Sequence, residues 1–216
     1  MNEKFFDLKT EKQNRIINAS LKIFASMGYQ KASTDDIVRE AGISKGLLFH
    51  YFESKLGLYI FLYDYSIKFI NLEITGALGP NDKEFFDVTQ KVFYAGVESL
   101  RQYPYMVYFL ETAKYEKNIE ALTAVDSMKK EFEIKTNEME AGLDFSKLKR
   151  GADYNMVKNY IMYTIITIMK KHLLEGSFNP DAFYEEGTAY INMLRGFVID
   201  NEVYVYQGVN EIPTTA

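Results

Sequence analysis

The feature that most limits how this chain can fold is a pair of short helix patterns separated by only three residues, Gly42-Ile43-Ser44. Ser33 can cap the start of the first pattern, and Asp36 stands three positions later, as in a capping box. Gly42 can end that helix, because glycine adopts the left-handed conformation without strain. A second helix is expected over 45–52. Two helices joined by a short turn that contains glycine are typical of the helix-turn-helix motif, which places its second helix in the major groove of DNA.

The second helix carries more aromatic residues than one buried face can hold. Leu48 and Phe52 lie four residues apart, so they share a face and can pack inward. Their expected partners in a small core are Ile43, Ile37 and Phe24. The residues left pointing away from this core are Lys45, Gly46, Leu47, Phe49, His50 and Tyr51. A hairpin used only for packing would give these aromatic and charged side chains no purpose, so the pattern favours a binding surface.

Residues 16–55, IINASLKIFASMGYQKASTDDIVREAGISKGLLFHYFESK, resemble the DNA-binding segment of the TetR family of bacterial regulators. The resemblance lies in the Gly28-Tyr29 break, the Asp36-Ile37 pair, the AGIS turn, the KGLLFHYF helix and the final SK. It covers one block of about 40 residues without an insertion. The rest of the chain is similar to the family only in its length and helical pattern, so no residue is carried over there.

The resemblance implies DNA-contacting roles for ten residues. Those at groove-facing or backbone-contacting positions are Lys45, Gly46, Leu47, Phe49 and His50; those at usual phosphate positions are Tyr51 and Lys55. Three more lie at helix starts, where hydroxyl and backbone N–H groups can hold phosphate: Ser33, Thr34 and Ser44. Leu47 and Phe49 depart from the more usual threonine and tyrosine, which favours van der Waals contact with thymine methyl groups. For His50, an ordinary surface histidine is the alternative.

The remaining sequence shows helical signals throughout and no convincing strand. A first helix is expected from Thr10, with Gln13 as its capping-box partner, to Gly28. Further helices are expected over about 55–75, 82–101, 104–115, 118–142, 153–176 and 180–200, with Pro104 in the first turn of its helix. The predicted fold class is all-α. It comprises a three-helix helix-turn-helix DNA-binding domain at 1–54, a helical ligand-binding and dimerisation domain at 55–206, and a C-terminal tail at 207–216.

The last two predicted helices, 153–176 and 180–200, carry apolar residues on more than one face. Such a surplus apolar stripe is typical of a helix that packs against a partner. The family resemblance implies that this partner is a second copy of the chain, in a four-helix contact. The homodimer would then read a pseudo-palindromic operator in double-stranded DNA.

The C-terminal half also holds more aromatic residues than a small core needs. Most of them belong to the core, but a cavity lined by such residues is a usual small-molecule site, and the resemblance adds the expectation of an effector. The candidate lining residues are Tyr63, Phe93, Tyr108, Phe109, Glu111 and Tyr163. Glu111 is either a solvated charge or, if it is buried among these aromatics, a sign of an aromatic or cationic effector.

Composition narrows the function classes. The chain has 216 residues and no cysteine, which excludes disulfides and thiolate chemistry. Its two histidines, His50 and His172, are far apart, and no catalytic or metal-binding constellation accompanies them, so we expect no enzyme, no metal site and no cofactor. No apolar run of membrane-spanning length and no targeting segment are found, which favours a cytoplasmic protein that does not bind membranes.

The net charge of −5 argues against a nucleic-acid partner when it is taken alone. Residues 1–55, however, hold 9 Lys and Arg against 7 Asp and Glu, so the basic excess lies in the candidate DNA-binding segment. We therefore predict a DNA-binding transcriptional regulator, a ligand-responsive repressor that acts as a homodimer. The alternative is a DNA-binding protein of the same fold with a role in nucleoid organisation or cell division.

Overall fold

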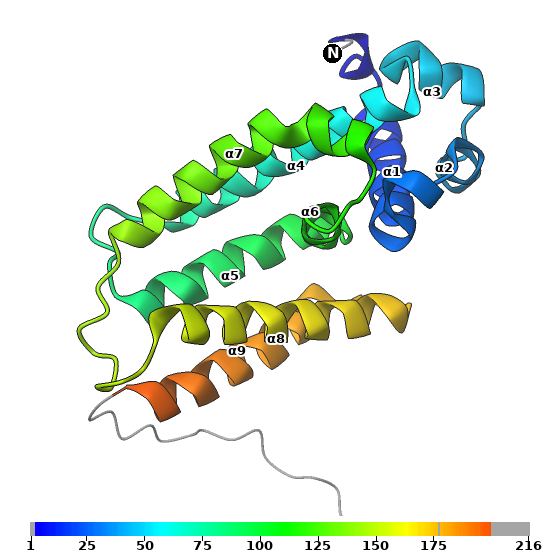
Figure 1. Ribbon diagram of the computed structural model, residues 1–216. Coiled ribbons are helices and arrows are strands. Elements are labelled where there is room, and N and C mark those ends of the chain that lie inside the picture. The colour runs from blue at the N-terminus through cyan, green and yellow to red at the C-terminus, as the bar shows by residue number, and fades with distance from the viewer. Residues whose placement is uncertain (1–2, 177, 200–216) are drawn as a thin grey trace, which may run out of the picture.

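The computed structural model describes residues 3–176 and 178–199, and the predicted boundary at 206 lies outside them. This part of the chain is helical and contains no strand, which confirms the all-α prediction (Figure 1). A 3-10 helix, η1 (Glu3–Phe5), precedes nine α-helices. They are α1 (Thr10–Lys31), α2 (Thr34–Ala41), α3 (Lys45–Phe52), α4 (Lys55–Ala77), α5 (Phe85–Gln102), α6 (Met106–Ala113), α7 (Ile119–Ala141), α8 (Tyr154–Leu174) and α9 (Pro180–Val198).

The helix-turn-helix motif forms as its local signals predict. The Ser33 side chain accepts a hydrogen bond from the backbone N–H of Asp35 at the start of α2. Gly42 ends α2 in the left-handed conformation, with φ of 63°. Ser44 caps α3 by accepting from the N–H of Leu47. Asp36 does not complete a capping box, because its carboxylate pairs with Arg39 on the next turn of the helix.

Two details of α1 and one of α6 differ from the prediction. Lys9, not Thr10, is the N-cap of α1, and the Gln13 side chain donates to the carbonyl oxygens of Phe6 and Leu8. Gly28 has φ of 70° and ψ of 169°, so it kinks α1 rather than ending it, and the helix continues to Lys31. Pro104 was predicted in the first turn of its helix but lies before it. Helix α6 begins only at Met106, with Tyr105 at the N-cap position.

The helices form a head at one end and a larger helical body (Figure 1). Helices α1 to α3 make the head. In the body, α4 packs against α5 and α7, and α9 packs against α5 and α8. Helix α6 is the element of the body that packs most extensively against α1. The chain therefore joins its head to its body through α4 in sequence and through α6 in space.

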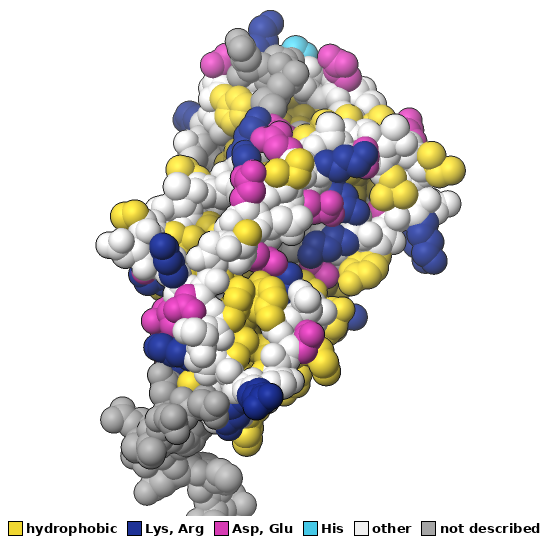
Figure 2. Space-filling model, turned by 60° about the vertical axis from the view of Figure 1, so that its left-hand side comes forward, with side chains coloured by type: hydrophobic (Ala, Val, Ile, Leu, Met, Phe, Trp, Pro, Cys, Tyr) yellow, Lys and Arg dark blue, Asp and Glu magenta, His cyan; other side chains and the backbone are white. Residues whose placement is uncertain are grey.

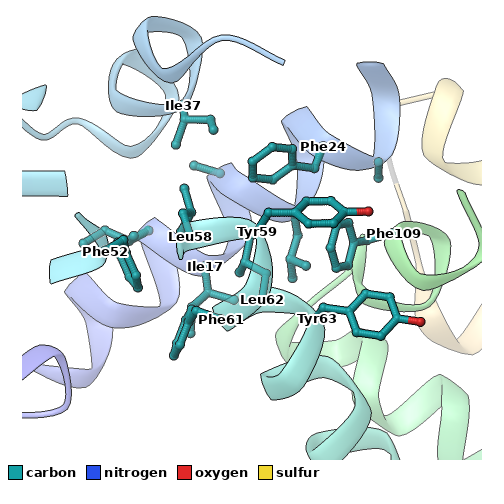
Figure 3. Packing of buried hydrophobic residues seen from close by; sticks show 14 of the residues in the cluster. Ile17, Phe24, Ile37, Phe52, Leu58, Tyr59, Phe61, Leu62, Tyr63 and Phe109 are labelled. Carbon is teal, nitrogen blue, oxygen red and sulfur yellow. The ribbon is translucent and has the colours of Figure 1, made fainter. Parts of the chain in front are cut away.

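One hydrophobic core runs through both parts. The Tyr59 ring of α4 lies 5.2 Å from that of Phe24 in α1 and 5.4 Å from that of Phe109 in α6, edge to face in both cases (Figure 3). Leu48 and Phe52 of α3 belong to the same buried cluster, as predicted. The predicted domain boundary coincides with the start of α4, but the core does not divide there. Two smaller clusters lie deeper in the body, between α5, α8 and α9.

The turn from α3 into α4 is unusually tight. Glu53 has φ of 65°, in the left-handed region, and the N–H of Ser54 donates to the carbonyl oxygen of Phe52 over 2.6 Å. The carbonyl group of Phe52 therefore lies close to the first turn of α4. A Cβ atom at Gly57 would lie only 2.1 Å from it, so glycine is needed there. The orientation of α3 on α4 thus depends on a residue outside the motif.

We expect Gly57→Ala to lower the free energy of unfolding by about 1–3 kcal/mol, because the added methyl group meets backbone rather than a movable side chain. Urea denaturation followed by circular dichroism measures this change. Gly96→Ala is the matched control, since its Cβ meets nothing within 4 Å inside α5, and it should be neutral or stabilising. Equal stability of the two variants would contradict the close contact.

Candidate functional site

Helix α3 presents the predicted residues on its outer face. Leu48 and Phe52 are buried, with exposed fractions of 1% and 6%, and they fix the helix on the core. Lys45, Gly46 and His50 are exposed. Leu47, Phe49 and Tyr51 are half-buried and flank this exposed strip. The six residues therefore lie together on the surface of a short helix whose opposite face is anchored, as a groove-entering helix requires.

The Lys45 ammonium group is held close to the start of α2. Its Nζ lies 2.8 and 3.1 Å from the two carboxylate oxygens of Asp35. Both side chains are largely exposed, and exposed ion pairs contribute little stability. Lys45 can thus exchange this carboxylate for a DNA phosphate or base at low cost. The hydroxyl oxygens of Ser33 and Ser44 accept capping bonds, which leaves their O–H groups to donate.

Tyr51 rests on a residue that the sequence did not single out. Its ring lies 5.7 Å from that of Phe5 and 5.0 Å from that of His50. Phe5, in η1, is 1% exposed and also packs against Phe52 and Phe61. A charged N-terminal segment gives no periodic signal for such burial. The segment before α1 thus supports the underside of α3 and the position of Tyr51.

Lys55 makes mainly internal contacts. Its Nζ donates to the carbonyl oxygens of Tyr29 at 2.9 Å and Ala32 at 3.2 Å. It also lies 4.4 Å from the centroid of the Tyr29 ring, in a cation–π contact. One of its three N–H donors is left for a phosphate, so that role stays a prediction. The structure shows a different role, in which Lys55 ties the start of α4 to the end of α1.

Glu116, between α6 and α7, completes this joint. Its Oε2 accepts from the backbone N–H of Tyr29 at 2.7 Å, and its Oε1 accepts from the N–H groups of Lys117 and Asn118, both at 2.9 Å. Burial acts to raise the pKa of Glu116, but these backbone donors and nearby Lys55 lower it below its ordinary value of 4.5 overall. An isolated glutamate in a loop gives no sequence signal for such a contact.

We expect Glu116→Gln to lower the free energy of unfolding by about 1–3 kcal/mol at pH 7, because N–H donors bind a carboxylate more strongly than an amide oxygen. The folded-state pKa is depressed, so the contribution is present above about pH 4.5 and lost as the pH falls through the folded pKa. Urea denaturation of both proteins between pH 3 and pH 7 measures the difference.

Glu185→Gln, at an exposed position of α9, is the control and should change stability little at any pH. A difference between wild type and Glu116→Gln that stays constant down to pH 3 would contradict the role of the ionised carboxylate.

A cavity of about 240 Å³ lies in the body between helices α4 to α9. Of the six predicted ligand-binding residues, Phe93 and Glu111 line it. The lining set is Ile70, Ile74, Val92, Phe93, Gly96, Val97, Leu100, Val107, Leu110, Glu111, Lys114, Phe132, Ile165, Met169 and Phe183. Most of these residues were missed, because apolar residues around a cavity have the same helical spacing as residues of a closed core.

The other four candidates lie elsewhere. Tyr63 and Phe109 are buried in the core shared by head and body, with their rings 6.4 Å apart. Burial there, with a smaller contribution from Glu133, raises the pKa of Tyr63 to about 12. Tyr108 is half-buried and packs against the core clusters rather than lining the cavity. Tyr163 does not line this cavity and is 58% exposed on the outer face of α8.

An apolar face covers the outer sides of α8 and α9. Its large exposed side chains recur at helical spacing, and they are Met156, Tyr160 and Tyr163 on α8 and Tyr190, Met193 and Phe197 on α9. Tyr160 and Tyr190 line one shallow depression between the two helices, so the two rows form a continuous surface. Figure 2 shows hydrophobic side chains gathered over the lower part of the molecule, at the level of these helices. We call this surface the α8–α9 face.

Comparison with known proteins agrees with this geometry. Residues 16–60 match the family described as "Bacterial regulatory proteins, tetR family". Over 55 residues the chain is 42% identical to the uncharacterized HTH-type transcriptional regulator YuxN of Bacillus subtilis (strain 168). These residues make up 26% of this chain and 19% of that protein. The chain thus matches about a fifth of the length of this curated relative. The family match covers most of the head and the first residues of α4.

Solved structures extend the likeness to the whole fold. A TetR family transcriptional regulator from Chloroflexus aurantiacus J-10-FL superposes with a TM-score of 0.57 at 19% identity, over 91% of this chain and 97% of that one. The transcriptional regulator FadR from Bacillus subtilis, in complex with stearoyl-CoA, gives a TM-score of 0.53 at 17% identity, over 83% and 96%. The predicted arrangement of a helix-turn-helix head on a helical body is therefore confirmed.

Within residues 3–176 and 178–199, no helix combines the length and the apolar character needed to cross a membrane. No group of three or more His, Cys, Asp or Glu side chains in the same part of the chain is placed to hold a metal ion.

Proposed function

We propose that this chain, which belongs to the tetR family of bacterial regulatory proteins through its residues 16–60, is a transcriptional regulator that binds operator DNA as a homodimer and responds to a small molecule. The observation that carries this proposal is the geometry of α3. Leu48 and Phe52 anchor the helix, while Lys45, Gly46 and His50 face outward together. A short exposed helix of this kind after a tight turn fits the major groove.

The DNA contacts divide into two kinds. The basic Lys45 and the hydroxyl groups at the starts of α2 and α3 suit phosphate, which supplies affinity without sequence preference. Leu47, Phe49 and His50 suit base edges, because apolar groups contact thymine methyls and an imidazole can donate to or accept from a base. The specificity for the DNA sequence would then come from the residues in the middle of α3.

We expect Lys45→Ala to weaken operator binding and to reduce the slope of log affinity against log salt concentration by about 1 per subunit, since one phosphate contact is lost from each head. Fluorescence anisotropy with labelled DNA, at several stated salt concentrations, measures both quantities. The operator can be taken from the DNA that flanks the gene or selected from random sequence.

Lys68→Ala is the matched control, because Lys68 is 71% exposed and also pairs with a carboxylate, that of Asp64, but lies on α4 outside the helices of the head. It should leave both the affinity and the salt slope close to wild type. If Lys45→Ala behaves like this control, α3 does not carry the DNA contact. Binding of wild type to many scattered sites without control of neighbouring genes would favour a nucleoid or cell-division role.

The α8–α9 face supports the homodimer. Two helices that each expose a row of large apolar residues can form a four-helix contact with the same helices of a second copy. Contact through one face on both copies gives two-fold symmetry, which matches the symmetry of a pseudo-palindromic operator. Exposed apolar surface of this extent on a monomer is otherwise unfavourable.

We expect Tyr163→Glu to raise the dimer dissociation constant by about 100-fold or more, because it places a charge from each copy in an apolar contact. Sedimentation equilibrium of wild type and variant measures the constant. Ile134→Glu is the control, as Ile134 is 57% exposed on α7, outside this face. If the Ile134→Glu dimer dissociates, or if the Tyr163→Glu dimer stays intact, the α8–α9 face is not the dimer interface.

Helix α6 provides the route from effector to DNA. Val107, Leu110 and Glu111 line the cavity, while Phe109 packs against Phe24 of the head. An effector that favours a shifted position of α6 would also shift the head, and the coupling is limited by the effector's differential affinity for the two positions. FadR from Bacillus subtilis, a regulator of similar fold, was solved in complex with stearoyl-CoA, which supports the view that a protein of this fold can bind a ligand with a long acyl chain.

A further inference from the structure

The cavity of the body is apolar except at one point. Thirteen of its fifteen lining residues are apolar or glycine, and the two charged ones are Glu111 and Lys114, one turn apart at the end of α6. Their charged groups pair across 2.5 Å. The charged lining of the cavity is therefore this one ion pair. The class of ligand that the cavity favours, cationic or anionic, depends on which of the two charged side chains pairs with the ligand.

The two charges differ in burial. The Glu111 side chain is 11% exposed, whereas that of Lys114 is 46% exposed. In the described part of the chain, the only hydrogen bond to the Glu111 carboxylate comes from Lys114. A carboxylate can accept about four hydrogen bonds, so Glu111 can accept further bonds from a ligand beside the one from Lys114. The Lys114 side chain, by contrast, is nearly half exposed to solvent.

This asymmetry favours a cationic ligand. An ammonium group placed beside Glu111 would add a charged donor to a buried carboxylate, while Lys114 could turn to solvent. An anionic head group would have to draw Lys114 away, which would leave the Glu111 carboxylate buried without a partner, an unfavourable arrangement. A neutral ligand would gain the apolar contacts but would leave the ion pair as it is.

The rest of the lining suits the remainder of such a ligand. Leu100, Met169 and Ile165 offer aliphatic and thioether contacts for an apolar body. Phe93, Phe132 and Phe183 place aromatic rings around the same space, and aromatic faces also attract cations.

We propose that the cavity binds hydrophobic cations, with an ammonium group beside Glu111 and an apolar body among the aliphatic and aromatic side chains of α5, α8 and α9. The inference rests on the proposed function only in taking this cavity as the effector site. In this arrangement Glu111 determines which ligand charge is preferred. Lys114 is the counter-ion of Glu111 in the free protein, and the ligand displaces it.

Three probes of equal chain length separate the classes: decylamine, which is protonated at pH 7, the neutral decanol and the anionic decanoate. Isothermal titration calorimetry of the purified full chain, with each probe below its micelle concentration, measures the affinities without DNA. We expect decylamine to bind at least about tenfold more tightly than either of the others, as a charge-assisted hydrogen bond in a buried site implies.

Variants of the ion pair make the assignment specific. Glu111→Gln should weaken decylamine by about tenfold or more and leave decanol nearly unchanged. Lys114→Met should leave decylamine binding intact or strengthen it, since it removes the competing cation. Glu131→Gln, which removes the carboxylate of an exposed Glu131–Lys135 pair on α7, is the control and should bind all three probes as wild type does.

Tighter binding of decanoate than decylamine, with loss of decanoate in Lys114→Met, would overturn the proposal in favour of an anionic effector. Equal affinities for all three probes, no binding of any, or equal decylamine affinity in Glu111→Gln and wild type would overturn it as well. DNA binding of the same preparations is measured separately. If the ligand preference fails but operator binding is intact, the proposal of a DNA-binding regulator still holds. If the protein binds no DNA specifically, the regulator proposal itself is contradicted.

Discussion

The contact on which the rest of the structure depends is the edge-to-face packing of Tyr59 between Phe24 and Phe109. These rings belong to α4, α1 and α6, three elements that are far apart in the sequence. Aromatic pairs of this geometry contribute about 0.5–1.5 kcal/mol beyond the burial of their surface. They help to fix the head on the body, and burial there raises the pKa of Tyr59, which keeps its phenol neutral.

Polar contacts surround this aromatic joint and limit how it can move. Lys55 holds the end of α1 through the carbonyl oxygens of Tyr29 and Ala32, and Glu116 holds the N–H of Tyr29 from the other side. Both polar atoms of the Tyr29 backbone are thus bonded to the body. Interfaces packed in this way tend to have discrete arrangements rather than a continuous range. A movement of α6 at the cavity would therefore displace the head as a unit.

The parts that could be predicted from the sequence depend on local rules. Ser33, Gly42 and Ser44 act within a few residues of themselves, so their capping roles and the position of α3 follow from the sequence. Gly57 and Glu116 could not be found in this way, because each is defined by a contact with backbone that only the folded chain brings near it. The same limit applies to Phe5, whose partners lie in α3 and α4.

The candidate ligand cavity shows a second limit. Helical periodicity places apolar residues inward, but it does not separate a filled core from a cavity, so Tyr63 and Phe109 were as plausible as Phe93. Tyr163 lies outside the cavity because a helix with two apolar faces does not reveal which one is turned to the body. Glu111 lines the cavity, although the sequence alone left a solvated charge as its alternative.

We propose that the head and the cavity form one coupled unit, joined by α6. Hydrogen–deuterium exchange of the wild-type chain, with and without operator DNA, tests it most directly, because linkage requires that DNA binding also affect the ligand site. We expect altered exchange in α2 and α3, and also in α6 (Met106–Ala113) and the adjoining Glu116 loop. Changes confined to residues 10–55, with α6 unaffected under saturating DNA, would contradict it.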